Sequence, residues 1–181
     1  MRALIVFASK YGATEGIAAR IADRLREQGV SAESFAAEKA PAPDEYDAVV
    51  VGSAAYYFHW MKEARAWVER NCEALVQRPV WMFSSGPLGT KPLDPNGRDL
   101  LEVTVPKEIP ELSARIHPKD HQVFFGALQP EKLGLFDRMV TKLPMNKDDV
   151  FLPPGDFRNW QEIDGWADEI ARELGVAQAK S

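Results

Sequence analysis

Short apolar runs alternate with longer stretches of helical periodicity along this 181-residue chain. Residues 2–8 are almost entirely apolar, which predicts a strand buried on both faces. In residues 14–28 apolar side chains recur three or four positions apart, which predicts an amphipathic helix that Gly29 can end. The same two patterns predict further strands at residues 31–36, 48–52, 79–84 and 121–127, and further helices at residues 63–76, 107–116, 130–143 and 159–174.

Five strands that alternate with helices predict an α/β fold with a doubly wound, mostly parallel sheet. Right-handed crossovers and a polar loop directly after the first strand favour the strand order 2-1-3-4-5. We expect residues 1–175 to form one domain and residues 176–181 to form a flexible tail. The long segment at residues 86–119 is an insertion between the fourth and fifth strands, and such segments serve as lids, docking surfaces or plain surface excursions.

Composition narrows the classes of function. The net charge is −5, which argues against general nucleic-acid binding and allows at most a peripheral contact with a membrane. Cys72 is the one cysteine, so no internal disulfide can form, which fits a reducing cytoplasm. The first apolar run is too short for a signal peptide, and no run approaches the roughly 20 residues that span a bilayer. We therefore expect a cytoplasmic protein.

Polar loops follow the first, third and fourth predicted strands. Because the carboxyl ends of parallel strands lie at one edge of a sheet, and ligands of doubly wound sheets bind beyond that edge, these loops are the candidate cofactor site. The candidate cofactor-binding residues are Ser9, Lys10, Tyr11, Gly12, Ala13, Thr14, Ser53, Ala54, Ala55, Tyr56, Tyr57, Ser84, Ser85, Gly86 and Pro87.

The first of these loops, residues 9–14, has the chemistry of a phosphate site. Ser9 and Thr14 offer hydroxyl donors, Gly12 lets the backbone approach a ligand closely, and the amides at the helix N-terminus favour an anion. Lys10 can add charge or point into water. The alternative interpretation is an ordinary helix N-cap at Ala13-Thr14 that binds no ligand.

These loops resemble those of flavodoxins. Ser9, Gly12 and Thr14 match the family's hydroxyl-x-x-Gly-x-Thr pattern, which binds the phosphate of FMN. The resemblance implies that the other two loops flank the isoalloxazine ring. Tyr56 or Tyr57 would then stack on the ring, while the alternative is that the aromatic residues of this loop pack on one another.

Within that superfamily the chain most resembles the menaquinone-dependent protoporphyrinogen oxidases. The likeness rests on Gly52-Ser53 followed by an aromatic cluster and His59, on the insertion at 86–119, and on three later segments, which are Gly126-Ala127-Leu128, Phe136-Asp137-Arg138-Met139 and Asn159-Trp160. It implies an FMN-dependent oxidoreductase that oxidises protoporphyrinogen IX with a quinone as acceptor, located at the inner face of the membrane. It also allows a homodimer.

Two questions stay open at the level of sequence. The competing function is a flavodoxin-type electron carrier that docks redox proteins through its acidic surface and has no small-molecule substrate of its own. His59 is the candidate catalytic residue, as a proton donor to reduced flavin or quinone. A surface or packing role is the favoured alternative, because histidine is commonly half-buried without a catalytic task. Three scattered histidines and one cysteine have no metal-site spacing, and no nucleophile elbow supports a hydrolase.

Overall fold

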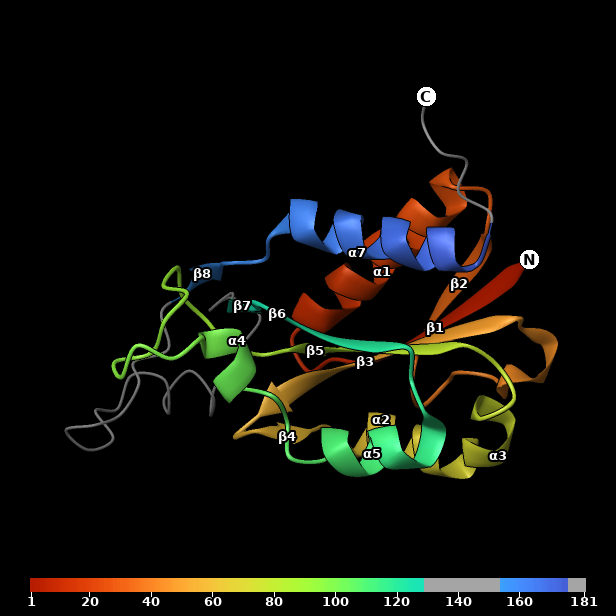
Figure 1. Cartoon of the computed structure of the whole chain (residues 1–181), viewed down its shortest axis with the longest axis horizontal. Coiled ribbons are helices and arrows are strands. Elements are labelled where there is room, and N and C mark those ends of the chain that lie inside the picture. Colours follow the sequence, from red (N-terminus) through yellow and green to blue (C-terminus); the bar gives the residue numbers. More distant parts are fainter. Residues whose placement is uncertain (129–153, 176–181) are drawn as a thin grey trace.

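Five parallel strands form the centre of the fold in the order β2-β1-β3-β5-β6 (Figure 1). The computed structural model describes residues 1–128 and 154–175. The strands are β1 (Arg2–Ala8), β2 (Ser31–Ala36), β3 (Ala48–Tyr56), β5 (Val80–Ser85) and β6 (Asp120–Phe124). This order confirms the predicted doubly wound sheet. A two-residue strand that the sequence did not indicate, β4 (His59–Trp60), pairs antiparallel with β3.

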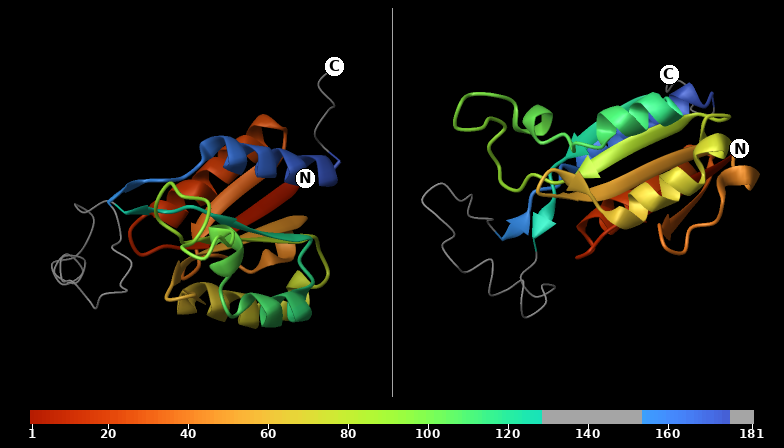
Figure 2. Two further views of the ribbon diagram at one scale, coloured as in Figure 1. Left: turned by 60° about the vertical axis from the view of Figure 1, so that its left-hand side comes forward. Right: turned by 90° about the horizontal axis from the view of Figure 1, so that it is seen from below.

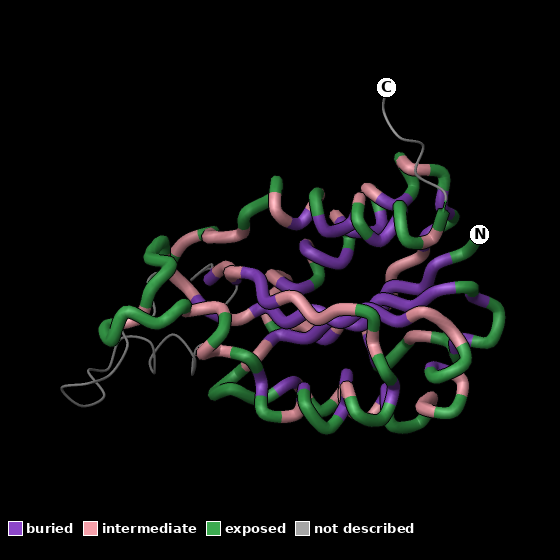
Figure 3. The backbone as a smooth tube through the Cα atoms, viewed as in Figure 1, coloured by how far each residue is buried: buried purple, intermediate pink, exposed green. Residues whose placement is uncertain are grey.

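Helices cover both faces of this sheet, which explains the apolar character of β1. Successive side chains of a strand point to opposite faces. Ala3 and Ile5 therefore join the hydrophobic cluster under one pair of helices, while Leu4 and Val6 join the cluster on the other face. Figure 1 shows α1 (Ala13–Glu27) and α7 (Trp160–Glu173) on one side, and α2 (Lys62–Arg70), α3 (Cys72–Leu75) and α5 (Ile109–Ile116) on the other. In Figure 3 the three central strands, β1, β3 and β5, are accordingly buried along most of their length.

The helix predicted at residues 63–76 is divided into α2 and α3. Asn71 stands between them with φ −110° and ψ 12°, outside the helical region. Its side-chain amide donates a hydrogen bond to the carbonyl oxygen of Trp67 at 2.8 Å. Asparagine side chains compete in this way with the backbone for its own hydrogen bonds, so the helix stops one turn early and restarts.

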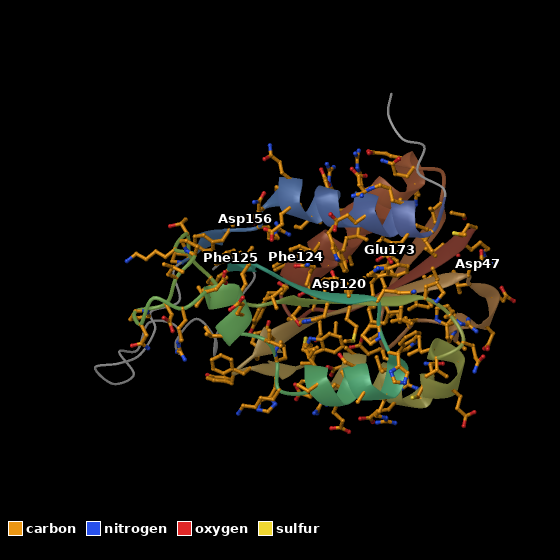
Figure 4. All side chains as sticks on the ribbon, viewed as in Figure 1. Asp47, Asp120, Phe124, Phe125, Asp156 and Glu173 are labelled. Carbon is orange, nitrogen blue, oxygen red and sulfur yellow. The ribbon has the colours of Figure 1, made fainter. Side chains whose placement is uncertain are left out.

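The last predicted strand, residues 121–127, also ends earlier than expected. β6 stops at Phe124, and the N–H of Gly126 donates to the carbonyl oxygen of Pro87 at 2.9 Å. The chain is thereby turned away from the sheet. Ala127–Leu128 then forms β7, which pairs antiparallel with β8 (Gly155–Asp156). In Figure 4, Phe125 and Asp156 lie on the side of the molecule at which the parallel strands finish, and Asp47 lies on the opposite side.

The insertion at residues 86–119 occupies the connection between β5 and β6, as expected, and has two helices. α5 confirms the helix predicted at residues 107–116. A single turn, α4 (Leu100–Val103), was not predicted; it begins at Asp99, whose carboxylate accepts from the N–H of Leu101 at 2.8 Å. Figure 2 shows the loop around α4 beyond the carboxyl ends of the strands, while α5 returns along the sheet.

The helix predicted at residues 130–143 and the tail at 176–181 lie outside the described residues. No helix within residues 1–128 and 154–175 has both the length and the apolar character that crossing a bilayer requires.

Candidate functional site

Buried polar side chains gather at the carboxyl edge of the sheet. In the described ranges, the polar or charged residues that are buried all come from the three predicted cofactor loops; they are Thr14, Ser53, Ser84 and Ser85. Burying a hydroxyl group is costly unless it is hydrogen-bonded. Their concentration at one edge of an otherwise apolar sheet therefore marks the place of a polar network, a polar ligand or both.

The loop between β1 and α1 has the geometry of an anion site. Gly12 is the N-cap of α1 and has φ 84°, a left-handed conformation that glycine adopts without strain. Its N–H donates to Ser9 Oγ at 3.0 Å, which leaves the hydroxyl proton of Ser9 for another acceptor. The N–H of Gly16 is bonded to the carbonyl oxygen of Gly12 at 3.0 Å. The amides of residues 13–15 precede that bond and are the helix's N-terminal donors.

The side chain of Thr14 is the strongest indication that this loop binds a ligand. Its side chain is fully buried, and its Oγ1 has no hydrogen-bond partner in the part of the chain that the structure describes. Leaving a buried hydroxyl unsatisfied costs about 1–3 kcal/mol. A phosphate oxygen bound at the positive end of α1 would supply the acceptor, so the residues present fit a phosphorylated ligand.

Arg158 contacts the same helical turn from the other end of the sequence. Its Nη1 donates to the carbonyl oxygen of Ala13 at 3.2 Å, and its guanidinium lies 4.4 Å from the ring centroid of Trp160. Nε and Nη2 donate to the two carboxylate oxygens of Asp156 at 2.8 and 2.5 Å. This bidentate ion pair holds the pKa of Asp156 below its usual range. Sequence reasoning missed Arg158, because no local pattern connects it with a turn some 145 residues earlier.

The second loop exposes aromatic rings beside the first. Tyr57 is 81% exposed and Phe58 48% exposed, whereas Trp60 is buried in the core. The ring of Tyr56 meets that of Tyr11 edge-on, with centroids 6.4 Å apart. The structure therefore brings the first two predicted loops together. Trp60 is a packing residue, and the rings of Tyr57 and Phe58 are available to a ligand.

His59, the candidate catalytic residue, is half-exposed and bound to the insertion. Its Nδ1 donates to Glu108 Oε1 at 2.7 Å. Glu108 also accepts from the backbone N–H of Trp60 at 3.1 Å and from Arg65 Nη1 at 3.2 Å. Burial would raise the pKa of Glu108, but the hydrogen bonds from His59 and Trp60 leave it below its usual value. The sequence offered no signal for Glu108, which lies 49 positions after His59.

Two of the predicted hydroxyl groups are already used within the protein. Ser53 Oγ donates to the carbonyl oxygen of Ala54 at 2.9 Å and accepts from the N–H of Met61 at 3.0 Å. Ser84 Oγ accepts from Trp60 Nε1 at 2.7 Å and lies 2.8 Å from His121 Nε2. These bonds attach β4 to β3 and β5, so Ser53 and Ser84 shape the site. Contact of either with a cofactor stays a prediction.

His121 is held in its neutral form. Burial lowers its pKa from 6.5 to about 4, against the opposing effect of the Asp120 carboxylate. A neutral ring nitrogen can accept the hydroxyl proton of Ser84, which Ser84 retains while accepting from Trp60. His121 thus takes part in the hydrogen-bond network that links Ser84 of β5 with Trp60 of β4.

The third loop lies against the second. A β-carbon on Gly86 would stand 3.3 Å from the β-carbon of Ala55, so the two backbones approach closely. The N–H of Gly86 donates to the carbonyl oxygen of Phe124 at 3.2 Å, and Pro87 accepts from Gly126. All three predicted loops thus form one edge of the molecule, which is where a doubly wound sheet binds its ligand.

Known proteins resemble this chain in both sequence and structure. A family model described as flavodoxin domain matches residues 4–150. Protoporphyrinogen IX dehydrogenase [quinone] of Escherichia coli K12 is 24% identical, with 94% of this chain and 95% of that protein covered. A flavodoxin from the domain Archaea superposes with a TM-score of 0.60 at 16% identity, over 97% of this chain and 99% of that one. Rubredoxin oxygen:oxidoreductase of Desulfovibrio gigas also gives 0.60, at 14% identity, over 96% of this chain and 36% of that protein.

Proposed function

The chain belongs to the flavodoxin domain family, and on that premise we propose that it binds FMN and acts as a flavin-dependent oxidoreductase. The observation that carries the proposal is the buried hydroxyl of Thr14, which has no partner among the described residues and stands in the first turn of α1. A phosphate there would complete the hydrogen bonding of Thr14 and of the helix's N-terminal amides.

Each of the three loops would contact a different part of the cofactor. Ser9, Thr14 and the amides of residues 13–15 would bind the phosphate. Tyr57 and the segment Ser84–Pro87 would flank the ring, because both lie at the same edge of the sheet. When bound, FMN supplies the reversible transfer of electrons. The protein supplies orientation, shielding from water and, through His59, a hydrogen-bonding group beside the ring.

For the substrate, we propose a porphyrinogen, with a quinone as electron acceptor. The name of the Escherichia coli relative supports this assignment, since that protein and this chain match over nearly their full lengths. The competing candidate is an electron carrier for redox proteins, which the net charge of −5 would suit.

The visible spectrum of the purified protein tests flavin binding. We expect the absorption bands of an oxidised flavin, and FMN in the supernatant after denaturation. A colourless protein that takes up no added FMN would contradict the proposal in both of its forms.

Steady-state kinetics separate the enzyme from the carrier. We expect the FMN-loaded protein to oxidise protoporphyrinogen IX only when a quinone is present, and free FMN at the same concentration is the control. A protein that exchanges electrons with redox proteins but leaves the porphyrinogen unchanged would be a carrier.

A further inference from the structure

The turn between β3 and β4 holds two bulky residues in a conformation that they rarely adopt. Tyr57 has φ 51° and Phe58 has φ 65°, and together they join Tyr56 and His59, which pair across the hairpin. Two-residue hairpin turns with positive φ at both positions usually contain Asn and Gly. Aromatic residues here are strained, so the surrounding structure must impose the conformation.

Residues at the end of the insertion hydrogen-bond to this turn and to the strand that follows it. The N–H of Lys107 donates to the carbonyl oxygen of Phe58 at 2.9 Å. The next residue, Glu108, binds both residues of β4, through the ring of His59 and the backbone N–H of Trp60. Glu108 is only 13% exposed, and Arg65 on α2 donates to the same carboxylate oxygen as His59.

These hydrogen bonds therefore hold the second residue of the turn and both residues of the strand that follows it. The opposite side of the hairpin reaches the first loop through the edge-on contact of Tyr56 with Tyr11. The turn is thus held between the first loop and the N-terminal end of α5. Its two rings are exposed although the backbone beneath them is held by several hydrogen bonds. A turn whose backbone is already held favours binding of a planar ligand, because less of the turn has to become ordered on binding.

We propose that Glu108 is a positioning residue for the flavin ring: through His59 and Trp60 its carboxylate holds the Tyr57–Phe58 turn in the conformation that presents its rings to the isoalloxazine. This inference rests on the proposed function. It gives the insertion at residues 86–119 a role in flavin binding, because Glu108 belongs to that insertion and contacts the hairpin.

Comparing FMN with riboflavin tests the proposal, because the two ligands share the ring and differ by the phosphate. We expect Glu108→Gln to raise the dissociation constants of both ligands by the same factor, about tenfold, since it weakens charge-assisted hydrogen bonds. We also expect bound riboflavin to be more fluorescent in this variant, because its ring is less closely stacked. Glu108→Ala should show a larger effect in the same direction.

Glu111→Gln is the matched control. Glu111 lies on α5, is 76% exposed and forms an ion pair with Arg115 at 4.0 Å. The Glu111→Gln variant should therefore bind FMN and riboflavin with the affinities of the parent protein. Thermal melting of each variant without flavin monitors folding. Should Glu108→Ala unfold, the folded Glu108→Gln variant carries the comparison.

Three results would overturn the inference. Unchanged riboflavin affinity and fluorescence in Glu108→Gln would show that the carboxylate is merely structural. Weaker binding of FMN alone would show that Glu108 acts through the phosphate loop. Unchanged riboflavin affinity after replacing Tyr57 and Phe58 by alanine would show that the turn does not touch the ring. In each case selective loss of FMN by Thr14→Val would leave the proposed function standing, whereas a parent protein that binds neither flavin would end both.

Discussion

The ring of Phe83 occupies the space in which a β-carbon at position 52 would stand, so Gly52 on β3 makes room for Phe83 on β5. Phe83 cannot easily move aside, because Phe124 and Trp166 each pack against it with ring centroids 6.2 Å away. We expect Gly52→Ala to lower the free energy of unfolding by about 2–3 kcal/mol through overpacking. Chemical denaturation measures the change.

Gly165→Ala is the matched control for that substitution. Gly165 lies inside α7, and a β-carbon there would meet nothing within 4 Å. Alanine should therefore raise stability by about 0.5–1 kcal/mol, the usual gain in helix propensity. Equal behaviour of the two variants would contradict the role assigned to Phe83.

The second prediction concerns the hydroxyl of Thr14. Thr14→Val keeps the shape of the side chain and removes the donor that we assign to the phosphate. We expect FMN binding to weaken by about 1.5–3 kcal/mol, or roughly tenfold to a hundredfold, as for a hydrogen bond to a charged group. Riboflavin lacks the phosphate, so its affinity should not change; titrations followed by flavin fluorescence give both constants. Equal FMN affinity in parent and variant would place the phosphate elsewhere.

The third prediction is a dependence of stability on pH that arises from His121. Its pKa is about 4 in the folded protein and 6.5 as the ordinary value, so between these values the unfolded chain binds a proton that the folded chain does not. The contribution is fully present above pH 6.5 and is lost as pH falls toward 4. Its full size is about 3 kcal/mol. Urea denaturation at a series of pH values measures it.

His121→Gln isolates this contribution from the carboxylates that titrate in the same range. Glutamine retains a polar group near Ser84 but does not titrate, so the variant should lose less stability than the parent between pH 6.5 and 4. Parallel curves for the two proteins over that range would show that His121 is protonated in the folded state.

The fourth prediction separates the shape of the β3–β4 turn from its rings. Replacing Tyr57 by Asn and Phe58 by Gly supplies the residues that prefer positive φ at both positions. The double variant should be more stable than the parent by about 1–2 kcal/mol, because the strain is relieved. It should nevertheless bind riboflavin about tenfold more weakly, because the stacking rings are gone. A double variant that retains riboflavin affinity would show that the rings do not contact the flavin.

Much of the fold could be predicted from the pattern of apolar residues. β1 is apolar at successive positions because helices cover both sides of the sheet, and this pattern can be recognised without coordinates. The insertion limits were also predictable, since β5 begins with four apolar residues, β6 ends in the apolar pair Val123-Phe124, and the segment between the two strands is rich in proline and charge. Asn71 and Gly126, which end or interrupt elements, act through hydrogen bonds to particular carbonyl groups. Those partners are set by packing, so the boundaries were misplaced.

The loop proposed to bind phosphate belongs to the part of the site that the order of residues determines. A strand, a short hydroxyl-bearing turn and a helix are contiguous there, so local geometry alone brings the proposed donors together. The aromatic turn differs: sequence places Tyr57 and Phe58 after β3, but the residues that hydrogen-bond to Phe58 and to β4, Lys107 and Glu108, come from the insertion. Arg158 likewise reaches the first turn of α1 from far along the chain. Contacts between distant segments exist only once the sheet has assembled, since the sheet's register decides which side chains meet.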